Sequence, residues 1–102
     1  MSSIPPSEAD LYIRGVSLAT ANRRVEQWYN TWRSAHPGSE LAVWTEDWSD
    51  PDWSVTIGLD SGGDVRAAVR DLADWLAPWD VIDQDAYDDI CEAKFVAASP
   101  AA

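Results

Sequence analysis

Residues 40–59 read ELAVWTEDWSDPDWSVTIGL and contain the pattern that decides the fold. In residues 53–59, large apolar side chains occupy every second position, an alternation typical of a half-buried β-strand. Residues 40–45 form a second extended segment, and the connection between the two contains Asp50-Pro51-Asp52, which favours a turn. We therefore predict a β-hairpin made of residues 40–45 and 53–59.

The pairing within this hairpin predicts which way its side chains point. If Val55 and Ile57 face the core, Leu41 and Val43 on the neighbouring strand should face it too. Successive side chains of a strand point to opposite faces, so Trp44 must lie on the outer face. Trp44 is then either covered by a second layer or exposed to solvent.

The segment before the hairpin predicts a strand followed by a helix. Residues 10–16 fit a short first strand. Ser17 is a suitable N-cap, because its hydroxyl can accept a hydrogen bond from a free amide at the start of a helix. Apolar residues then recur at steps of three and four, as in an amphipathic helix: Leu18, Ala21, Val25, Trp28, Trp32 and Ala35. Pro37-Gly38 ends this helix.

A second amphipathic helix follows the hairpin. A turn at residues 60–63 leads into it, and Pro78 ends it. Its apolar stripe consists of Val65, Ala68, Val69, Leu72, Trp75 and Leu76. Residues 80–83 fit a short extended piece and residues 85–92 a short acidic helix. Residues 93–97 fit either a last strand or the end of that helix.

These elements predict an α+β fold in which two helices cover one face of a small, mostly antiparallel sheet of three to four strands. The topology is ferredoxin-like if the last element is a strand. We predict one domain over residues 10–98, with a flexible arm at residues 1–9 and a frayed end at residues 99–102.

The charge balance restricts the partners that the chain can bind. The 102 residues include 18 acidic and 7 basic ones, which gives a net charge of −11. Such a surface repels phosphates, so direct binding to nucleic acid or to an anionic membrane is disfavoured and a basic protein partner is favoured. Adaptation to salt, or solubility alone, is an equally good interpretation of the acidic surface.

The remaining composition predicts a cytoplasmic protein. Cys91 is the single cysteine, which excludes an internal disulfide framework and a cysteine-rich zinc site. The first six residues lack the basic and apolar regions of a signal peptide. No apolar run approaches the roughly 20 residues needed to span a bilayer. The oligomeric state is left open.

Motifs for catalysis or ligand binding are weak. His36 stands beside Pro37 at a helix end, without a nucleophile elbow or a second histidine, so we interpret it as a capping or surface residue. The sequence DSGGD at residues 60–64 lacks the lysine and the glycine spacing of a phosphate loop. The acidic run from Asp80 to Glu92 has no EF-hand spacing, and a domain this small rarely builds a paired-carboxylate glycosidase cleft. We therefore predict no catalytic residue, no metal site and no cofactor.

The seven tryptophans divide into two groups. Four lie on predicted core faces: Trp28, Trp32, Trp53 and Trp75. The other three have no obvious cover: Trp44, Trp48 and Trp79. Exposed tryptophan is enriched in binding hot spots, although each of the three could also pack under a neighbouring loop.

We predict a contact loop made of Trp44, Glu46, Asp47, Trp48, Asp50 and Asp52. We predict a second acidic patch made of Asp83, Asp85, Asp88 and Asp89.

The hairpin also resembles a known family. Trp28-Tyr29 in a helix, an extended segment ending at Thr45, and the run DPDWSVTI before Leu59 are similar to the bacterial toxin-immunity family numbered fifty-three. That family has a Trp-Tyr helix, a threonine, an Asp-Asn-Pro-Gly-Trp turn and an alternating apolar strand. The resemblance covers residues 25–60. Asp52 stands where the family has glycine, the loop after Thr45 is longer, and the family's Trp-Glu-His stretch is absent. The resemblance implies a small cytoplasmic protein that binds and neutralises a toxin domain, with no catalytic residues to carry over.

Three classes of function remain open at this point. The first is a non-enzymatic inhibitor that masks a basic site on its partner, as a toxin-immunity protein, an antitoxin or a phage anti-defence protein would. The second is a nucleic-acid mimic, whose spaced carboxylates imitate phosphates against a DNA- or RNA-binding protein. The third is a small-ligand or sugar binder that uses tryptophan platforms. The net charge and the resemblance favour the first class.

Overall fold

The fold consists of one four-stranded sheet and three helices. The computed structural model describes residues 6–98 of the chain. The elements are β1 (Glu8–Arg14), α1 (Leu18–Ala35), β2 (Ala42–Asp47), β3 (Val55–Asp60), α2 (Arg66–Leu76), β4 (Asp80–Asp83) and α3 (Gln84–Ala98). The strand order is β2-β3-β1-β4, and all neighbouring strands are antiparallel. The predicted α+β class is confirmed. The first six elements have the ferredoxin-like order, and α3 extends it.

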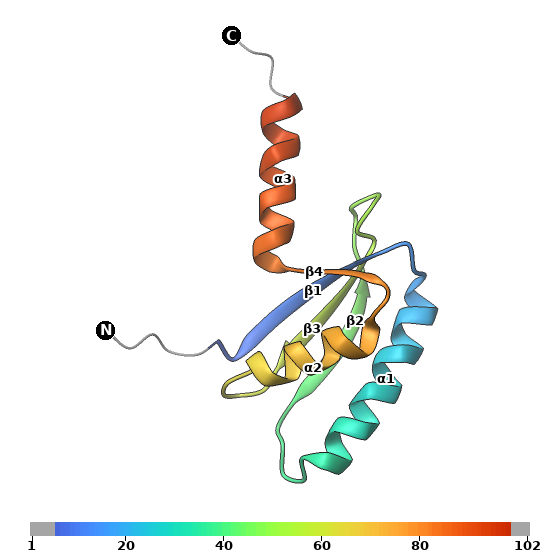
Figure 1. The fold of residues 1–102 in the computed structure, drawn as a ribbon, viewed down its shortest axis with the longest axis vertical. Helices are drawn as coiled ribbons and strands as arrows, with labels where there is room; N and C mark the ends of the chain where they lie inside the picture. The colour runs from blue at the N-terminus through green and yellow to red at the C-terminus, as the bar shows by residue number, and fades with distance from the viewer. Residues whose placement is uncertain (1–5, 99–102) are drawn as a thin grey trace, which may run out of the picture.

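The main core lies between one face of the sheet and the helices α1 and α2 (Figure 1). The paired residues Leu11 and Ile57 face these helices, as do Ile13 and Val55. The apolar stripes predicted for both helices fill the opposite side of this core. The side chain of Trp28 is almost fully buried there. Two helices therefore cover one face of the sheet, as predicted.

Local signals at the ends of α1 also agree with the sequence. The backbone N–H of Thr20 donates a hydrogen bond to the hydroxyl of Ser17 over 3.2 Å, which confirms Ser17 as the N-cap. Gly38, just after the helix, has a φ of +87°, a left-handed conformation that glycine adopts without a steric penalty. The predicted end of the helix at Pro37-Gly38 is confirmed.

The strand boundaries differ from the prediction by about two residues. β1 begins at Glu8, because Glu8 and Ala9 already pair with Asp60 and Leu59 of β3. It ends at Arg14, since Gly15 has a φ of +76° and turns the chain toward α1. β2 also lies two residues later than expected. Two residues of the predicted arm therefore belong to the sheet, while residues 1–5 and 99–102 lie outside the described part of the chain.

Trp53 does not begin the core-facing register of β3, so that prediction is wrong. The carboxylate of Asp50 accepts hydrogen bonds from the backbone N–H groups of Asp52 and Trp53, over 2.8 and 3.1 Å. This local turn ends the alternation before the strand starts at Val55. The side chain of Trp53 is buried in a second cluster, with Tyr12 of β1 and Tyr87 of α3.

The burial of β3 differs from the prediction. Residues 55–59 are all buried, because the main core covers one face of the strand and other side chains cover the opposite face. The expectation of a half-buried strand is therefore wrong for β3. The cause is cover contributed by segments distant in sequence, which the alternation of β3 alone cannot reveal.

The chain after β4 forms one continuous helix, α3, so residues 93–97 are the end of a helix rather than a strand. The carboxylate of Asp83 accepts a hydrogen bond from the backbone N–H of Ala86 over 2.9 Å and so caps this helix. α3 contacts β1 and β4 and projects away from the sheet (Figure 1). The acidic helix predicted at residues 85–92 is therefore present and longer than predicted, and it lies apart from the two helices that cover the sheet.

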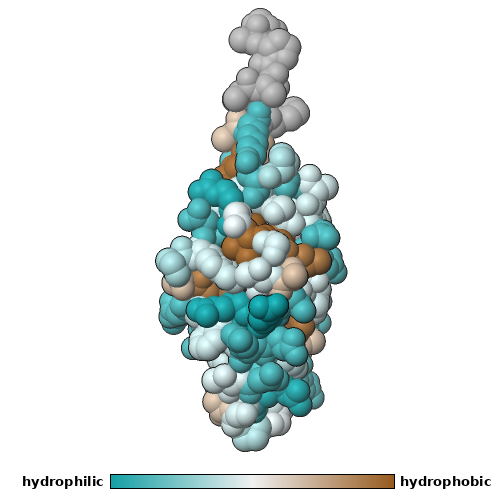
Figure 2. Space-filling model, turned by 90° about the vertical axis from the view of Figure 1, so that its right-hand side faces the viewer, coloured by the Kyte–Doolittle hydropathy of each residue, from teal (hydrophilic) through white to brown (hydrophobic). Residues whose placement is uncertain are grey.

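The surface on the side where α1 lies is mostly hydrophilic, with hydrophobic residues gathered near its middle (Figure 2). Within residues 6–98, no helix combines the length and the apolar character needed to cross a membrane.

Candidate binding surface on the outer face of the sheet

The face of the sheet that points away from α1 and α2 carries the most unusual exposed side chain. We call it the outer face. On this face, Trp44 of β2, Gly58 of β3 and Asp10 of β1 form one row, because Gly58 pairs with both other residues. Trp44 therefore lies on the outer face, as the hairpin register predicts.

The indole of Trp44 lies directly on the backbone of Gly58. A β-carbon added at Gly58 would collide with the Cε2, Cζ2 and Nε1 atoms of that ring. The missing side chain of Gly58 thus creates the seat on which the indole rests. Trp44 still exposes 44% of its surface, so the other side of the ring is open to a partner.

Three carboxylates lie on the same face of the sheet as this ring. Glu46 follows Trp44 by two residues on β2, Asp60 follows Gly58 by two residues on β3, and Asp10 completes the row on β1. Side chains two apart on a strand, or adjacent across strands, are neighbours on one face, at roughly 5–7 Å. Glu46 is a neighbour of Trp44 by this rule, and Asp10 and Asp60 are neighbours of Gly58, whereas Asp10 lies two strands, roughly 10 Å, from Trp44. We call Trp44, Glu46, Asp10 and Asp60 the acidic platform. Within residues 6–98, none of its three carboxylates takes part in an ion pair.

Sequence reasoning missed Asp10 and Asp60 as candidate site residues. Each belongs to a different strand from Trp44, and their proximity follows from the order β2-β3-β1. The sequence contains part of the information needed to find Asp10, because Asp10 and Tyr12 lie on the same side of an alternating strand. Placing that side next to Trp44 required the pairing of β1 with β3.

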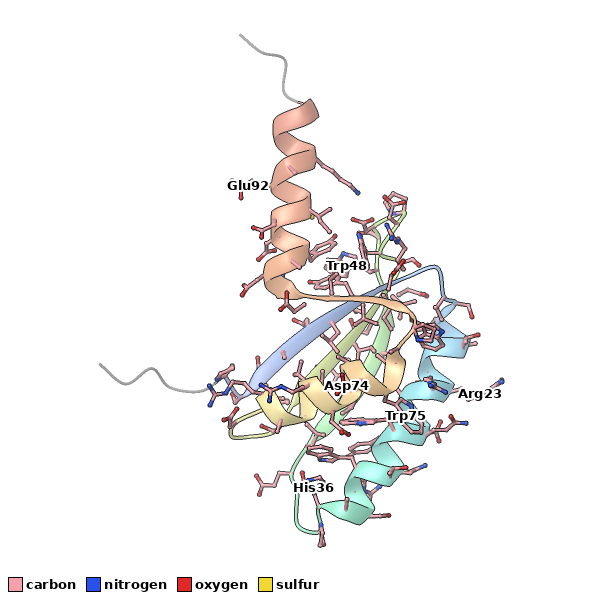
Figure 3. The ribbon with its side chains drawn as sticks, viewed as in Figure 1. Arg23, His36, Trp48, Asp74, Trp75 and Glu92 are labelled. Atoms are coloured by element: carbon pink, nitrogen blue, oxygen red, sulfur yellow. The ribbon has the colours of Figure 1, made fainter. Side chains whose placement is uncertain are left out.

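The predicted contact loop divides into several parts. Glu46 belongs to the acidic platform, whereas Asp47 pairs with Val55 and alternates to the opposite face. The indole Nε1 of Trp48 donates a hydrogen bond to the Tyr87 hydroxyl over 2.8 Å, and that hydroxyl donates to Asp50 over 3.0 Å. Asp50 and Trp48 therefore connect the β2–β3 loop to α3. Trp48 lies where α3 meets this loop (Figure 3) and remains 42% exposed.

The contact between the loop and α3 has further members. Tyr12 stacks on Tyr87 with a centroid separation of 3.9 Å, and its hydroxyl donates to Gln84 over 2.7 Å. Lys94 forms an ion pair with Asp52 over 3.2 Å. We call this set the α3 clasp: Tyr12, Trp48, Asp50, Asp52, Gln84, Tyr87 and Lys94. Four residues of the clasp come from outside the predicted loop.

Electrostatics fix the protonation states within the clasp. Burial raises the pKa of Tyr87 to about 12 and raises the pKa of Tyr12 above its ordinary value. The backbone N–H groups of Trp53 and Asp52 hold the pKa of the Asp50 carboxyl below its usual range. At neutral pH both tyrosines are therefore protonated donors and Asp50 is a charged acceptor.

The predicted second acidic patch lies at the end of β4 and on the first turns of α3. Asp83 caps α3, and Asp88 accepts a hydrogen bond from the side chain of Gln84 over 2.8 Å. Asp85 and Asp89 are exposed. Asp83 and Asp85 line a groove that Glu8 and Asp10 of β1 also line. One end of this patch thus approaches the acidic platform through β1.

The other tryptophans have structural contacts. Trp32, Trp75 and Trp79 are partly buried against the main core. Trp75 lies between α2 and α1 (Figure 3), where its Nε1 donates to the Arg24 carbonyl over 3.1 Å. The guanidinium of Arg24 lies 6.0 Å from the Trp79 ring. Trp44 and Trp48 are the large hydrophobic side chains that the described residues leave exposed.

The two motifs that the sequence made weak candidates for a site, His36 and the turn at residues 60–64, also have contacts within the fold. The ring of His36 stacks on Trp32 at a centroid separation of 3.8 Å, at the end of α1. In the turn before α2, Asp60 and Ser61 accept hydrogen bonds from the backbone N–H groups of Gly62 and Gly63. Over residues 6–98, no three His, Cys, Asp or Glu side chains are grouped so that they could hold a metal ion.

Comparisons with known proteins give no relative. No family model matches the chain, and no curated protein or solved structure matches it either. The resemblance of the hairpin to the immunity family numbered fifty-three therefore stays a prediction.

Proposed function

We propose that this chain is a non-enzymatic binding protein that inhibits a basic partner by covering a functional site on it. A toxin-immunity protein, an antitoxin and a phage anti-defence protein all act in this way, in the cytoplasm. The observation that carries the proposal is the acidic platform, in which an exposed indole rests on Gly58 and three carboxylates on the same face of the sheet form no ion pairs within residues 6–98.

The chemistry of the acidic platform matches a lysine or arginine side chain. The face of an indole attracts a cation within about 6 Å of its centroid, with roughly 0.5–2 kcal/mol depending on solvation. Glu46 supplies an acceptor beside the ring, and Asp10 and Asp60 supply acceptors at positions next to Gly58 on the same face. The net charge of −11 adds long-range attraction, which accelerates encounter with a basic partner and weakens at high salt.

Direct binding of single-stranded RNA is disfavoured for this chain, although other four-stranded sheets of the same topology bind RNA. Four-stranded sheets of this topology bind RNA through aromatic side chains on their central strands, with bases stacked on the rings. Here Tyr12 on the central strand β1 is already stacked on Tyr87 of α3. Asp10 and Asp60 would also repel the phosphates of the strand.

A nucleic-acid mimic is the second candidate. The carboxylates of Glu46, Asp60 and Asp10 lie on three neighbouring strands and could imitate a series of phosphates. Breadth of inhibition distinguishes the two candidates. A mimic competes with nucleic acid on several unrelated binding proteins, whereas an immunity protein inhibits one partner.

The experiment co-expresses this chain with the product of the adjacent gene in a bacterial host and follows growth. We expect the adjacent product to be basic and toxic alone, and the wild-type chain to restore growth. Asp10→Lys and Trp44→Ala should lose protection, because they invert or remove parts of the acidic platform. Asp74→Lys is the matched control, since Asp74 is exposed on α2 (Figure 3) and the substitution changes the charge equally.

Two results would contradict this proposal. Equal loss of protection in Asp10→Lys and Asp74→Lys would mean that total charge, not the acidic platform, determines binding. An adjacent product that is harmless and does not bind the chain would remove the basis for an immunity role.

A further inference from the structure

One half of β1 has a free edge. β4 pairs with residues 11–14 of β1, and the chain then turns directly into α3. Glu8, Ala9 and Asp10 pair with β3 on one side. Within residues 6–98, no strand pairs with these three residues on the other side.

The hydrogen-bond pattern shows which backbone groups point out of this edge. The N–H of Ser61, just after β3, donates to the carbonyl of Ser7 over 2.9 Å, so Ser7 faces β3. Successive residues of an antiparallel strand alternate between the two neighbours. Ala9 therefore faces β3 like Ser7, and the N–H and C=O groups of Glu8 and the N–H of Asp10 point toward the free side. The C=O of Asp10 belongs to the ladder with β4, which begins at the pair of Leu11 and Asp83.

A groove runs along this free edge. Its volume is about 570 Å³, and it lies between β1, the first turns of α2 and the start of α3. Val65 just before α2, Val69 of α2 and Ala9 of β1 supply apolar side chains that also contact the main core. The groove thus combines unpaired backbone groups with apolar contacts, the two features that an added β-strand needs.

Charge decides what kind of strand fits. Four carboxylates line the groove: Glu8, Asp10, Asp83 and Asp85. Arg66 and Arg70 also line it, but Arg66 is held by Asp64 in an ion pair of 2.7 Å. A second copy of this chain would bring the same carboxylates against one another and would be repelled.

We propose that the groove binds an extended basic segment of the partner, which adds as a strand to Glu8–Asp10 of β1. Its backbone pairs with the N–H and C=O of Glu8 and with the N–H of Asp10. Its lysine or arginine side chains reach the four carboxylates. The sign of the segment's charge rests on the proposed function, whereas the free edge does not depend on it.

The first test is an NMR titration of the intact chain with a blocked heptapeptide of alternating lysine and valine. The control peptide has the same sequence with every peptide nitrogen methylated, so it keeps the charge, loses its backbone donors and carries methyl groups that block close pairing with a second strand. We expect the amide protons of Glu8 and Asp10 to shift downfield and to exchange more slowly with the first peptide. The methylated peptide should cause less than about a third of that shift.

The second test uses a pair of variants at one position. Asp10→Pro removes the outward N–H, which an edge strand tolerates because its ladder with β3 does not use this group. Asp10→Asn removes the same charge and keeps the N–H. Both variants should retain the wild-type circular dichroism. Asp10→Pro should bind the peptide on the order of fivefold more weakly than Asp10→Asn.

Two outcomes overturn the inference. Equal shifts from the two peptides would show that charge alone attracts them. Movement of the Trp44 indole signal without change at Glu8 and Asp10 would place the peptide on the acidic platform, which contradicts strand addition and leaves the proposed function intact.

Discussion

Gly58 illustrates how a single residue determines the character of the outer face. A residue without a side chain in the middle of a strand usually weakens the sheet. Here its position under Trp44 lets the indole lie flat on the strand and keeps one side of the ring open. The sequence shows both residues, but their contact depends on the pairing of β2 with β3.

Gly58→Ala tests this contact. The new methyl group should displace the Trp44 indole from its seat and lower the free energy of unfolding by about 1–3 kcal/mol. Gly63→Ala is the control, because no atom lies within 4 Å of a β-carbon at that position and its φ is not positive. Urea unfolding followed by tryptophan fluorescence gives both values. Equal stability of the two variants would contradict the role assigned to Gly58.

Trp53 shows at the same scale why alternation can mislead. Its spacing to Val55 fits the strand, so the sequence predicts the same face for both. The turn formed by Asp50 holds the backbone of Trp53 outside the strand, which begins at Val55, and Tyr12 and Tyr87 provide a separate apolar environment. Sequence reasoning predicted that Trp53 is buried, but assigned it to the wrong cluster.

At the scale of elements, α3 is the part that sequence reasoning described least well. Its contact stripe is narrow, with Tyr87, Ile90 and Cys91 as the members that contact the second cluster. β4 before it has only four residues, too few for a clear alternation. The α3 clasp joins residues from opposite ends of the sequence, so its geometry exists only after the sheet has formed.

The protonation of Tyr87 predicts how the clasp responds to alkaline pH. Because the folded pKa is about 12 and the ordinary value is 10.0, the folded state keeps this proton more tightly than the unfolded chain. The resulting stability is fully present below pH 10 and is lost as the pH rises toward 12. Denaturant midpoints measured between neutral pH and pH 11 should fall progressively for the wild type.

Tyr87→Phe provides the control for this pH effect. The variant cannot ionise at position 87, so its midpoint should fall less steeply above pH 10 than that of the wild type. It should also be less stable at neutral pH, because Trp48 and Asp50 each lose a hydrogen-bond partner. If the denaturant midpoints of the two proteins fell in parallel with pH, the assignment of the alkaline effect to Tyr87 would be contradicted.

At the scale of the whole molecule, periodicity in the sequence was sufficient for the fold class. Two amphipathic helices and an alternating hairpin predicted an α+β sheet protein, and the structure has this architecture. The acidic platform was less accessible to prediction. Trp44 and Glu46 were named from the sequence, but Asp10 and Asp60 join them through strand order, a property of the assembled sheet.

The net charge predicts that salt stabilises the fold. Repulsion among the excess carboxylates opposes the compact state, and ions screen it. Raising sodium chloride from about 0.02 M to about 0.5 M should increase the Tm on the order of 5 °C. A double variant with Asp85→Lys and Asp89→Lys should show a smaller increase, since it reduces the net negative charge. An identical salt response of both proteins in scanning calorimetry would argue against this explanation.

Because Trp44 is exposed on the outer face, its intrinsic fluorescence can report binding at that face. An open indole among carboxylates attracts caesium ions and repels iodide, so the two collisional quenchers of fluorescence should act on it unequally. Trp28 is shielded from both by burial. Any molecule that covers Trp44 would reduce this asymmetry, and a binding event could be followed on the unlabelled chain.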